Sequence, residues 1–86
     1  MNLSRADCGE IRASLQGKAT GFTYADVAIW LSHADFTPPP KTGGSHRTWR
    51  HPSGRRMPLV DKGHGNLLPV YVKRAAKAIL DIGGCT

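Results

Sequence analysis

The sequence contains no long apolar run. None of its hydrophobic stretches approaches the roughly 20 residues that a membrane-spanning helix needs. Residues 1–10 also lack the apolar segment of a secretory signal peptide. We therefore expect a cytoplasmic protein that makes no use of a membrane.

Cysteine is scarce: Cys8 and Cys85 stand near opposite ends of the chain. Small secreted domains held together by disulfides usually carry more cysteines than this. There is no Cys-x-x-Cys pair, and the four histidines do not stand at zinc-finger spacing from the cysteines. The scarcity predicts two reduced thiols, no structural metal and no cofactor.

The chain is short, and its 86 residues suffice for one domain with one small core. Hydrophobic residues make up 40% of the chain and charged residues 21%, which is ordinary for a globular protein and unlike a disordered one. We therefore treat residues 1–86 as a single domain.

Acidic residues are outnumbered, six against twelve lysines and arginines. Basic and acidic residues number three and four in residues 1–36, six and one in residues 37–62, and three and one in residues 63–86. A basic middle third on a near-neutral chain indicates an anionic partner. Nucleic acid is favoured over an acidic protein because arginine predominates there, and its planar guanidinium matches phosphate.

Three segments have the spacing of helices. Ser4 and Asp7 have the spacing of a capping box ahead of residues 5–16. Thr23 and Asp26 have the same spacing ahead of an apolar stripe over residues 24–34. A last helix begins at Pro69, a residue suited to the first turn, and ends at Gly83-Gly84.

Between the second and third helices, the pattern predicts an antiparallel hairpin of residues 45–51 and 55–60 around a Pro-Ser-Gly turn. A three-residue loop sets the register, which pairs Arg50 with Arg56, Trp49 with Met57 and His46 with Val60. The three prolines at 38–40 reduce residues 36–41 to an edge strand at best. The predicted class is therefore α+β, with two or three strands.

Alternation along these strands predicts two different faces. The core face carries Trp49, Met57 and Leu59. The other face carries His46, Thr48, Arg50 and Arg56.

Three of the four histidines, at positions 46, 51 and 64, lie within nineteen residues in or next to the basic region. Histidine transfers protons near neutral pH. RNA carries its own nucleophile, the 2′-hydroxyl, so a ribonuclease needs a base near that hydroxyl and a cation near the phosphate, but no metal. Ser45, His46 and Arg47 supply a hydroxyl, a base and a guanidinium in consecutive residues.

The pattern resembles the HicA family of bacterial toxins, which are mRNA-cleaving ribonucleases of toxin–antitoxin pairs. The resemblance covers residues 23 to 82 and rests on four features in order: Gly44-Ser45-His46-Arg47, His51-Pro52-Ser53-Gly54-Arg55-Arg56, His64, and Leu68-Pro69 opening a basic helix. The Gly-Phe that commonly follows the family's first helix appears here as Asp35-Phe36. Residues 1–22 look like the N-terminal helical extension of some members.

The resemblance implies an α-β-β-β-α core at residues 23–82, similar to a double-stranded-RNA-binding domain, with helices on one face of the sheet. It also implies that His46 is the catalytic residue and that an antitoxin of the HicB type masks it.

We thus predict a metal-independent endoribonuclease that cleaves mRNA through His46. Auxiliary candidates are Ser45, His51 and His64. The predicted RNA-phosphate ligands are Lys41, Arg47, Arg50, Arg55 and Arg56. The alternatives are a non-catalytic double-stranded-RNA-binding module and a small adaptor for an acidic protein.

Overall fold

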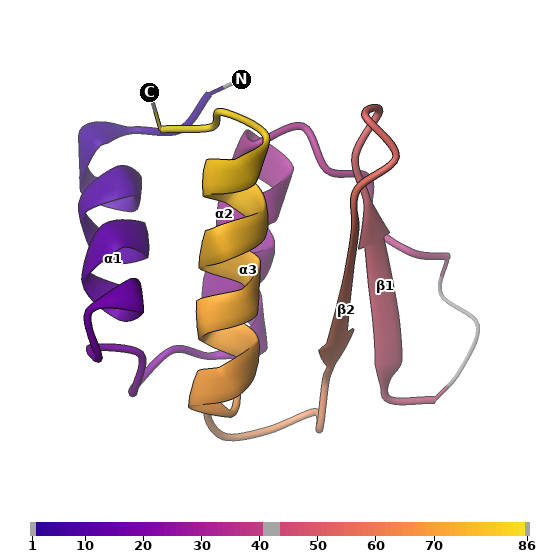
Figure 1. Cartoon of the computed structure of the whole chain (residues 1–86). Helices are drawn as coiled ribbons and strands as arrows, with labels where there is room; N and C mark the ends of the chain where they lie inside the picture. Colours follow the sequence, from indigo (N-terminus) through magenta and orange to yellow (C-terminus); the bar gives the residue numbers. More distant parts are fainter. Residues whose placement is uncertain (1, 41–43, 86) are drawn as a thin grey trace.

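The structure, a computed structural model, describes residues 2–40 and 44–85 (Figure 1). Within these ranges the chain forms helices α1 (Arg5–Leu15), α2 (Tyr24–His33) and α3 (Pro69–Asp81) and strands β1 (His46–Arg50) and β2 (Arg56–Val60). The two strands pair antiparallel. The α+β class is confirmed. No helix among the described residues is both long and apolar enough to cross a membrane.

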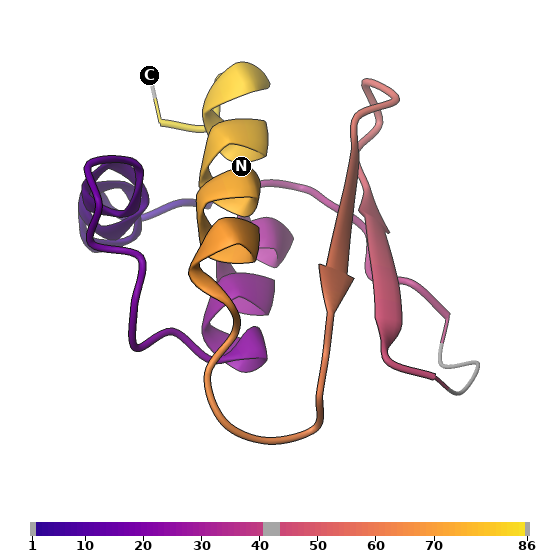
Figure 2. The same ribbon diagram turned by 60° about the horizontal axis from the view of Figure 1, so that its bottom comes forward.

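The elements lie in three layers. The hairpin is on one side, α2 and α3 are in the middle, and α1 is on the far side, as Figure 2 shows from a second direction. α1 packs against α3, and α3 packs against both α2 and β2. The N-terminal extension therefore covers helices and not the sheet, and the hairpin is covered by helices on one face only.

Local chemistry fixes the starts of α1 and α2. Ser4 Oγ accepts from the Asp7 N–H at 3.0 Å while the Asp7 carboxylate accepts from the Ser4 N–H at 3.2 Å. Thr23 and Asp26 form the same reciprocal pair, at 3.2 Å and 2.9 Å. Each capping box satisfies backbone donors that have no partner inside the helix. Both predicted capping boxes are confirmed.

The predicted hairpin register is also confirmed. His46, Trp49 and Arg50 stand opposite Val60, Met57 and Arg56. Gly54 closes the turn with a φ of 94°, a value that favours glycine because it has no Cβ. Trp49, Met57 and Leu59 are buried, as expected of the core face.

The expected edge strand is reduced to a single bridge. The Thr37 N–H donates to the Arg50 carbonyl at 2.6 Å, and the Arg50 N–H donates back at 3.1 Å. The prolines that follow lack the N–H groups that a longer ladder needs. Among the described residues the sheet therefore contains two strands. The predicted phosphate ligand Lys41 lies outside the described residues.

The prediction of two reduced thiols is wrong. Cys8 and Cys85 form a disulfide across a sequence separation of 77 residues, with a Cα–Cα distance of 5.7 Å. The physical reason is that α1 packs against α3 and that the two helices run in opposite directions. The first turns of α1 therefore lie beside the end of α3 (Figure 1). Gly84 allows the segment after α3 to lie close to Leu3 and Ile79. A Cβ at this position would lie 2.6 Å from Ile79 Cγ2 and 2.9 Å from Leu3 Cδ1.

Candidate functional site

One face of the hairpin points away from all the helices of the described residues (Figures 1 and 2). We call it the open face, and the register assigns to it His46, Thr48, Arg50, Arg56, Pro58 and Val60. Of these, His46, Arg50, Arg56 and Pro58 are exposed, and the other two are half-buried. The face therefore presents one imidazole and two guanidinium groups to solvent.

His46 lies at the end of the hairpin where β1 begins and β2 finishes. It stands opposite Val60, and the residue after Val60, Asp61, donates its N–H to the Ser45 carbonyl at 2.7 Å. This bond extends the ladder past His46 and fixes its backbone. The Ser45 side chain is exposed beside it.

Arg50 and Arg56 face each other directly at the opposite end of the strands. Arg50 is four positions after His46, which corresponds to about 14 Å along a strand. Like charges directly opposite each other in a sheet destabilise it. The same arrangement attracts an anion that can lie between the two guanidinium groups.

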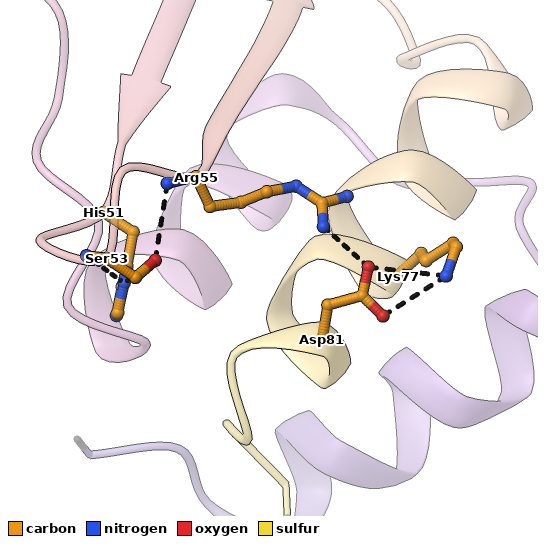
Figure 3. Close-up of polar contacts among 5 residues, drawn as sticks. All are labelled: His51, Ser53, Arg55, Lys77 and Asp81. Atoms are coloured by element: carbon orange, nitrogen blue, oxygen red, sulfur yellow. Dashed lines mark hydrogen bonds and ion pairs between the residues drawn. The ribbon is translucent and has the colours of Figure 1, made fainter.

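The other two arginines of the predicted set point elsewhere. Arg47 stands opposite Leu59, on the helix-facing side, and is half-buried. Arg55 turns toward α3, where its Nη1 lies 2.6 Å from Asp81 Oδ2 (Figure 3). Lys77 Nζ lies 3.2 Å from the other oxygen of the same carboxylate. Hydrogen bonds from Arg55 and then Lys77 lower the pKa of Asp81.

His51 is part of the turn. Its Nδ1 accepts from the Ser53 N–H at 3.1 Å and lies 2.9 Å from Ser53 Oγ (Figure 3). The centroid of its ring lies 5.1 Å from the centroid of the Phe36 ring. His51 and His46 therefore occupy opposite ends of β1, and the structure does not bring them together.

His64 lies in the loop between β2 and α3, at the same end of the hairpin as His46, and is exposed. Bonds at both ends hold this loop: the Gly63 N–H donates to Asp61 Oδ1 at 2.9 Å, and the Leu67 N–H donates to the Phe22 carbonyl at 2.7 Å. His64 lines a hollow of about 400 Å³ together with Tyr24 and Asp61.

Two features of this end of the molecule were missed by sequence reasoning. Lys62 is exposed and comes two residues after Val60, the register partner of His46. Extending the hairpin register by two residues would have placed it there. Tyr24 accepts a hydrogen bond from Trp49 Nε1 at 2.9 Å and so joins the start of α2 to β1. No sequence signal pairs these two residues.

The described residues contain no group of three or more histidine, cysteine or acidic side chains arranged to hold a metal ion. Comparison with protein-family models, with curated proteins and with solved structures finds no match to this chain.

Proposed function

We propose that the protein is a HicA-like toxin, an endoribonuclease that cleaves mRNA in the cytoplasm without a metal and that an antitoxin of the HicB type holds inactive. The observation that carries the proposal is the open face itself. An exposed histidine shares it with a pair of exposed arginines whose direct opposition destabilises the hairpin. Such a local conflict is typical of residues kept for function.

The proposed fold relationship, a core like that of double-stranded-RNA-binding domains, has support in element order. α2, the Thr37 bridge, β1, β2 and α3 follow one another, with both helices on the same side of the hairpin. Asp35 also supports it. This residue has a φ of 69°, which favours glycine, at the position where the family commonly has glycine.

In the proposed reaction, His46 takes the proton of a ribose 2′-hydroxyl, and the resulting oxygen attacks the adjacent phosphorus. The bond to the 5′-oxygen of the next nucleotide breaks, and that oxygen takes up a proton. Arg50 and Arg56, about 14 Å along the strand, hold phosphates elsewhere on the same RNA strand. Lys62 is the exposed described cation closest in register to His46, and we assign it to the scissile phosphate.

The disulfide bears on the proposed location. Disulfides seldom persist in the cytoplasm, where thiol reductants keep cysteines reduced. The proposal therefore requires that the chain with reduced Cys8 and Cys85 remain folded and active at growth temperature.

The test compares His46→Ala with His64→Ala. Both histidines are exposed, so each change should cost less than about 1 kcal/mol of stability. Loss of the proton-transfer group should slow cleavage by about 10²–10⁴-fold in His46→Ala, and the loss in His64→Ala should be smaller. The measurements are cleavage of a long RNA in EDTA, growth arrest on induction, and thermal melting of the same samples. His51→Ala is not a suitable control, because that ring contacts Phe36 and Ser53.

Near-normal cleavage by His46→Ala would show that His46 is not the catalytic residue. Wild-type protein that binds double-stranded RNA and cleaves none would favour the non-catalytic RNA-binding module. Absence of any RNA affinity at low salt would favour an adaptor for an acidic protein.

A further inference from the structure

The Cys8–Cys85 disulfide lies at the edge of a hollow of about 540 Å³. The hollow is formed by the first turns of α1, the residues just before them and the segment after α3. Its lining includes both cysteines, Arg5, Arg12 and Ser4. Its size is within the range of small-molecule sites. The lining residues belong to the beginning of α1 and to the segment after α3. These segments lie near the chain termini and away from the start of β1, where His46 stands (Figure 1).

The charged side chains that line this hollow are Arg5 and Arg12. Arg12 Nη2 donates to the carbonyl of Cys85. Arg5 forms no ion pair with any described residue. Asp7, the acidic residue closest to Arg5 in sequence, is engaged elsewhere, with its Oδ2 3.2 Å from His33 Nδ1. The side chains that line the hollow therefore carry a net positive charge, which attracts an anion.

We propose that the Cys8–Cys85 bond is a site of thiol–disulfide exchange with small anionic thiols. The hollow admits the thiol, the two arginines attract its charge, and the disulfide is the reacting group. This inference is independent of the RNA-cleaving function proposed above.

The exchange is a two-step displacement. A thiolate attacks Cys8 Sγ, because Cys8 is half-buried whereas Cys85 is only 7% exposed. The sulfur–sulfur bond breaks, and its electron pair leaves on Cys85 as a thiolate near the Arg12 guanidinium. A second thiolate then attacks the sulfur of the bound small thiol and frees Cys8. The protein gains two electrons and takes up two protons, and two small thiols leave as their own disulfide.

The fold keeps the two thiols close after reduction. The Gly84 N–H donates to the Ile79 carbonyl at 2.9 Å, which holds the segment against the end of α3 through a contact that does not involve the disulfide. Gly84 also lies beside Leu3, just before α1, since a Cβ added at Gly84 would lie 2.9 Å from Leu3 Cδ1. The reduced cysteines therefore remain neighbours, and exchange is reversible.

The experiment measures the rate of reduction of the full, oxidised chain by 2-mercaptoethanesulfonate, which is anionic, and by 2-mercaptoethanol, which is neutral and of similar size. Rates are expressed per thiolate and followed by mass spectrometry. We expect the ratio of anionic to neutral rates to be about three- to tenfold higher in the wild type than in Arg5→Gln. The difference should shrink at 1 M salt. Lys18→Gln is the matched control, because it removes a positive charge that lies after the C-terminal end of α1. It should keep the wild-type ratio.

Arg5→Lys retains the charge and should also keep the ratio, which separates attraction from any loss of folding. Equal ratios in wild type and Arg5→Gln would overturn the proposal. So would reduction that occurs only when the protein is unfolded by denaturant, or air-purified protein that contains two free thiols.

Discussion

Arg55 of the hairpin turn and Asp81 at the end of α3 form an ion pair of 2.6 Å, although 26 residues separate them in sequence. Lys77, one helical turn before Asp81, reinforces the pair from the same helix. The contact holds the turn end of the hairpin beside α3 (Figure 3). It also means that Arg55 is used in holding the fold together, whereas its neighbour Arg56 is exposed on the open face.

The first prediction concerns pH. Hydrogen bonds from Arg55 and Lys77 lower the pKa of Asp81 below its usual 3.8 in the folded chain. A carboxyl group with a lowered folded-state pKa stabilises the protein above its usual pKa, and this contribution is lost as pH falls through the lowered value. Asp81→Asn should therefore melt slightly below the wild type at pH 6, and the two melting temperatures should converge near pH 2. Because the pair is exposed to solvent, the difference should be small and should shrink with salt. A difference that persists unchanged at pH 2 would contradict the assignment.

The second prediction concerns Arg56→Gln, which should move stability and RNA affinity in opposite directions. Removing one of two directly opposed positive charges should raise stability by about 0.2–1 kcal/mol. Loss of one phosphate contact should make the salt dependence of single-stranded RNA affinity less steep by about 0.7 in the log–log slope. Thermal melting and RNA titrations at several salt concentrations measure the two effects. Lys73→Gln, an exposed charge on α3, is the control and should leave both quantities near wild type. A slope that Arg56→Gln leaves unchanged would remove Arg56 from the proposed RNA contacts of the open face.

The third prediction concerns the bond between α2 and β1. Tyr24→Phe removes the acceptor of the Trp49 Nε1 hydrogen, and Trp49 is only 4% exposed. A buried donor left without a partner costs about 1–3 kcal/mol. Tyr71→Phe is the matched control, because no described residue forms a hydrogen bond with the Tyr71 hydroxyl. Denaturant unfolding of both variants gives the two free energies, and equal losses would show that the Trp49 bond contributes nothing specific.

The fourth prediction concerns the disulfide. A bond between residues 77 apart restricts the unfolded chain strongly, and loop-closure entropy gives a stabilisation of about 4.5 kcal/mol. The double variant Cys8→Ser/Cys85→Ser should lose an amount of this order in the free energy of unfolding. The proposed cytoplasmic function needs this variant to remain folded at growth temperature. Under reducing conditions, the double variant and the wild type should have the same free energy of unfolding. A double variant as stable as the oxidised wild type would show that the bond is absent or ineffective.

The parts of the fold that depend on neighbouring residues could be predicted from the sequence. The capping boxes at Ser4 and Thr23 act over three residues, and the loop length around Gly54 fixes the hairpin register. From that register, the burial of Trp49 and the exposure of His46 follow by alternation. By the same alternation Arg47 lies on the opposite face from His46, which argues against Arg47 as a phosphate ligand beside that histidine.

The remaining features depend on contacts between distant parts of the chain. Nothing near Arg55 in sequence indicates that its partner is Asp81, because the pair exists only once α3 lies beside the turn. The disulfide likewise results from the packing of α1 on α3. Cysteine number is a guide to the cell compartment in which a protein works, and it does not report how far apart two thiols are in the fold.

The position of the disulfide also determines how the molecule responds to mechanical load. The covalent ring that it closes runs from Cys8 to Cys85 and contains all three helices apart from the first three residues of α1, together with the whole hairpin. A pulling force applied at the two ends of the described chain would pass from one cysteine directly to the other and leave the ring unstretched. In the oxidised state, extension in a force experiment should therefore be limited to the few residues outside the ring. Reduction should release the length of the ring in one or more unfolding steps.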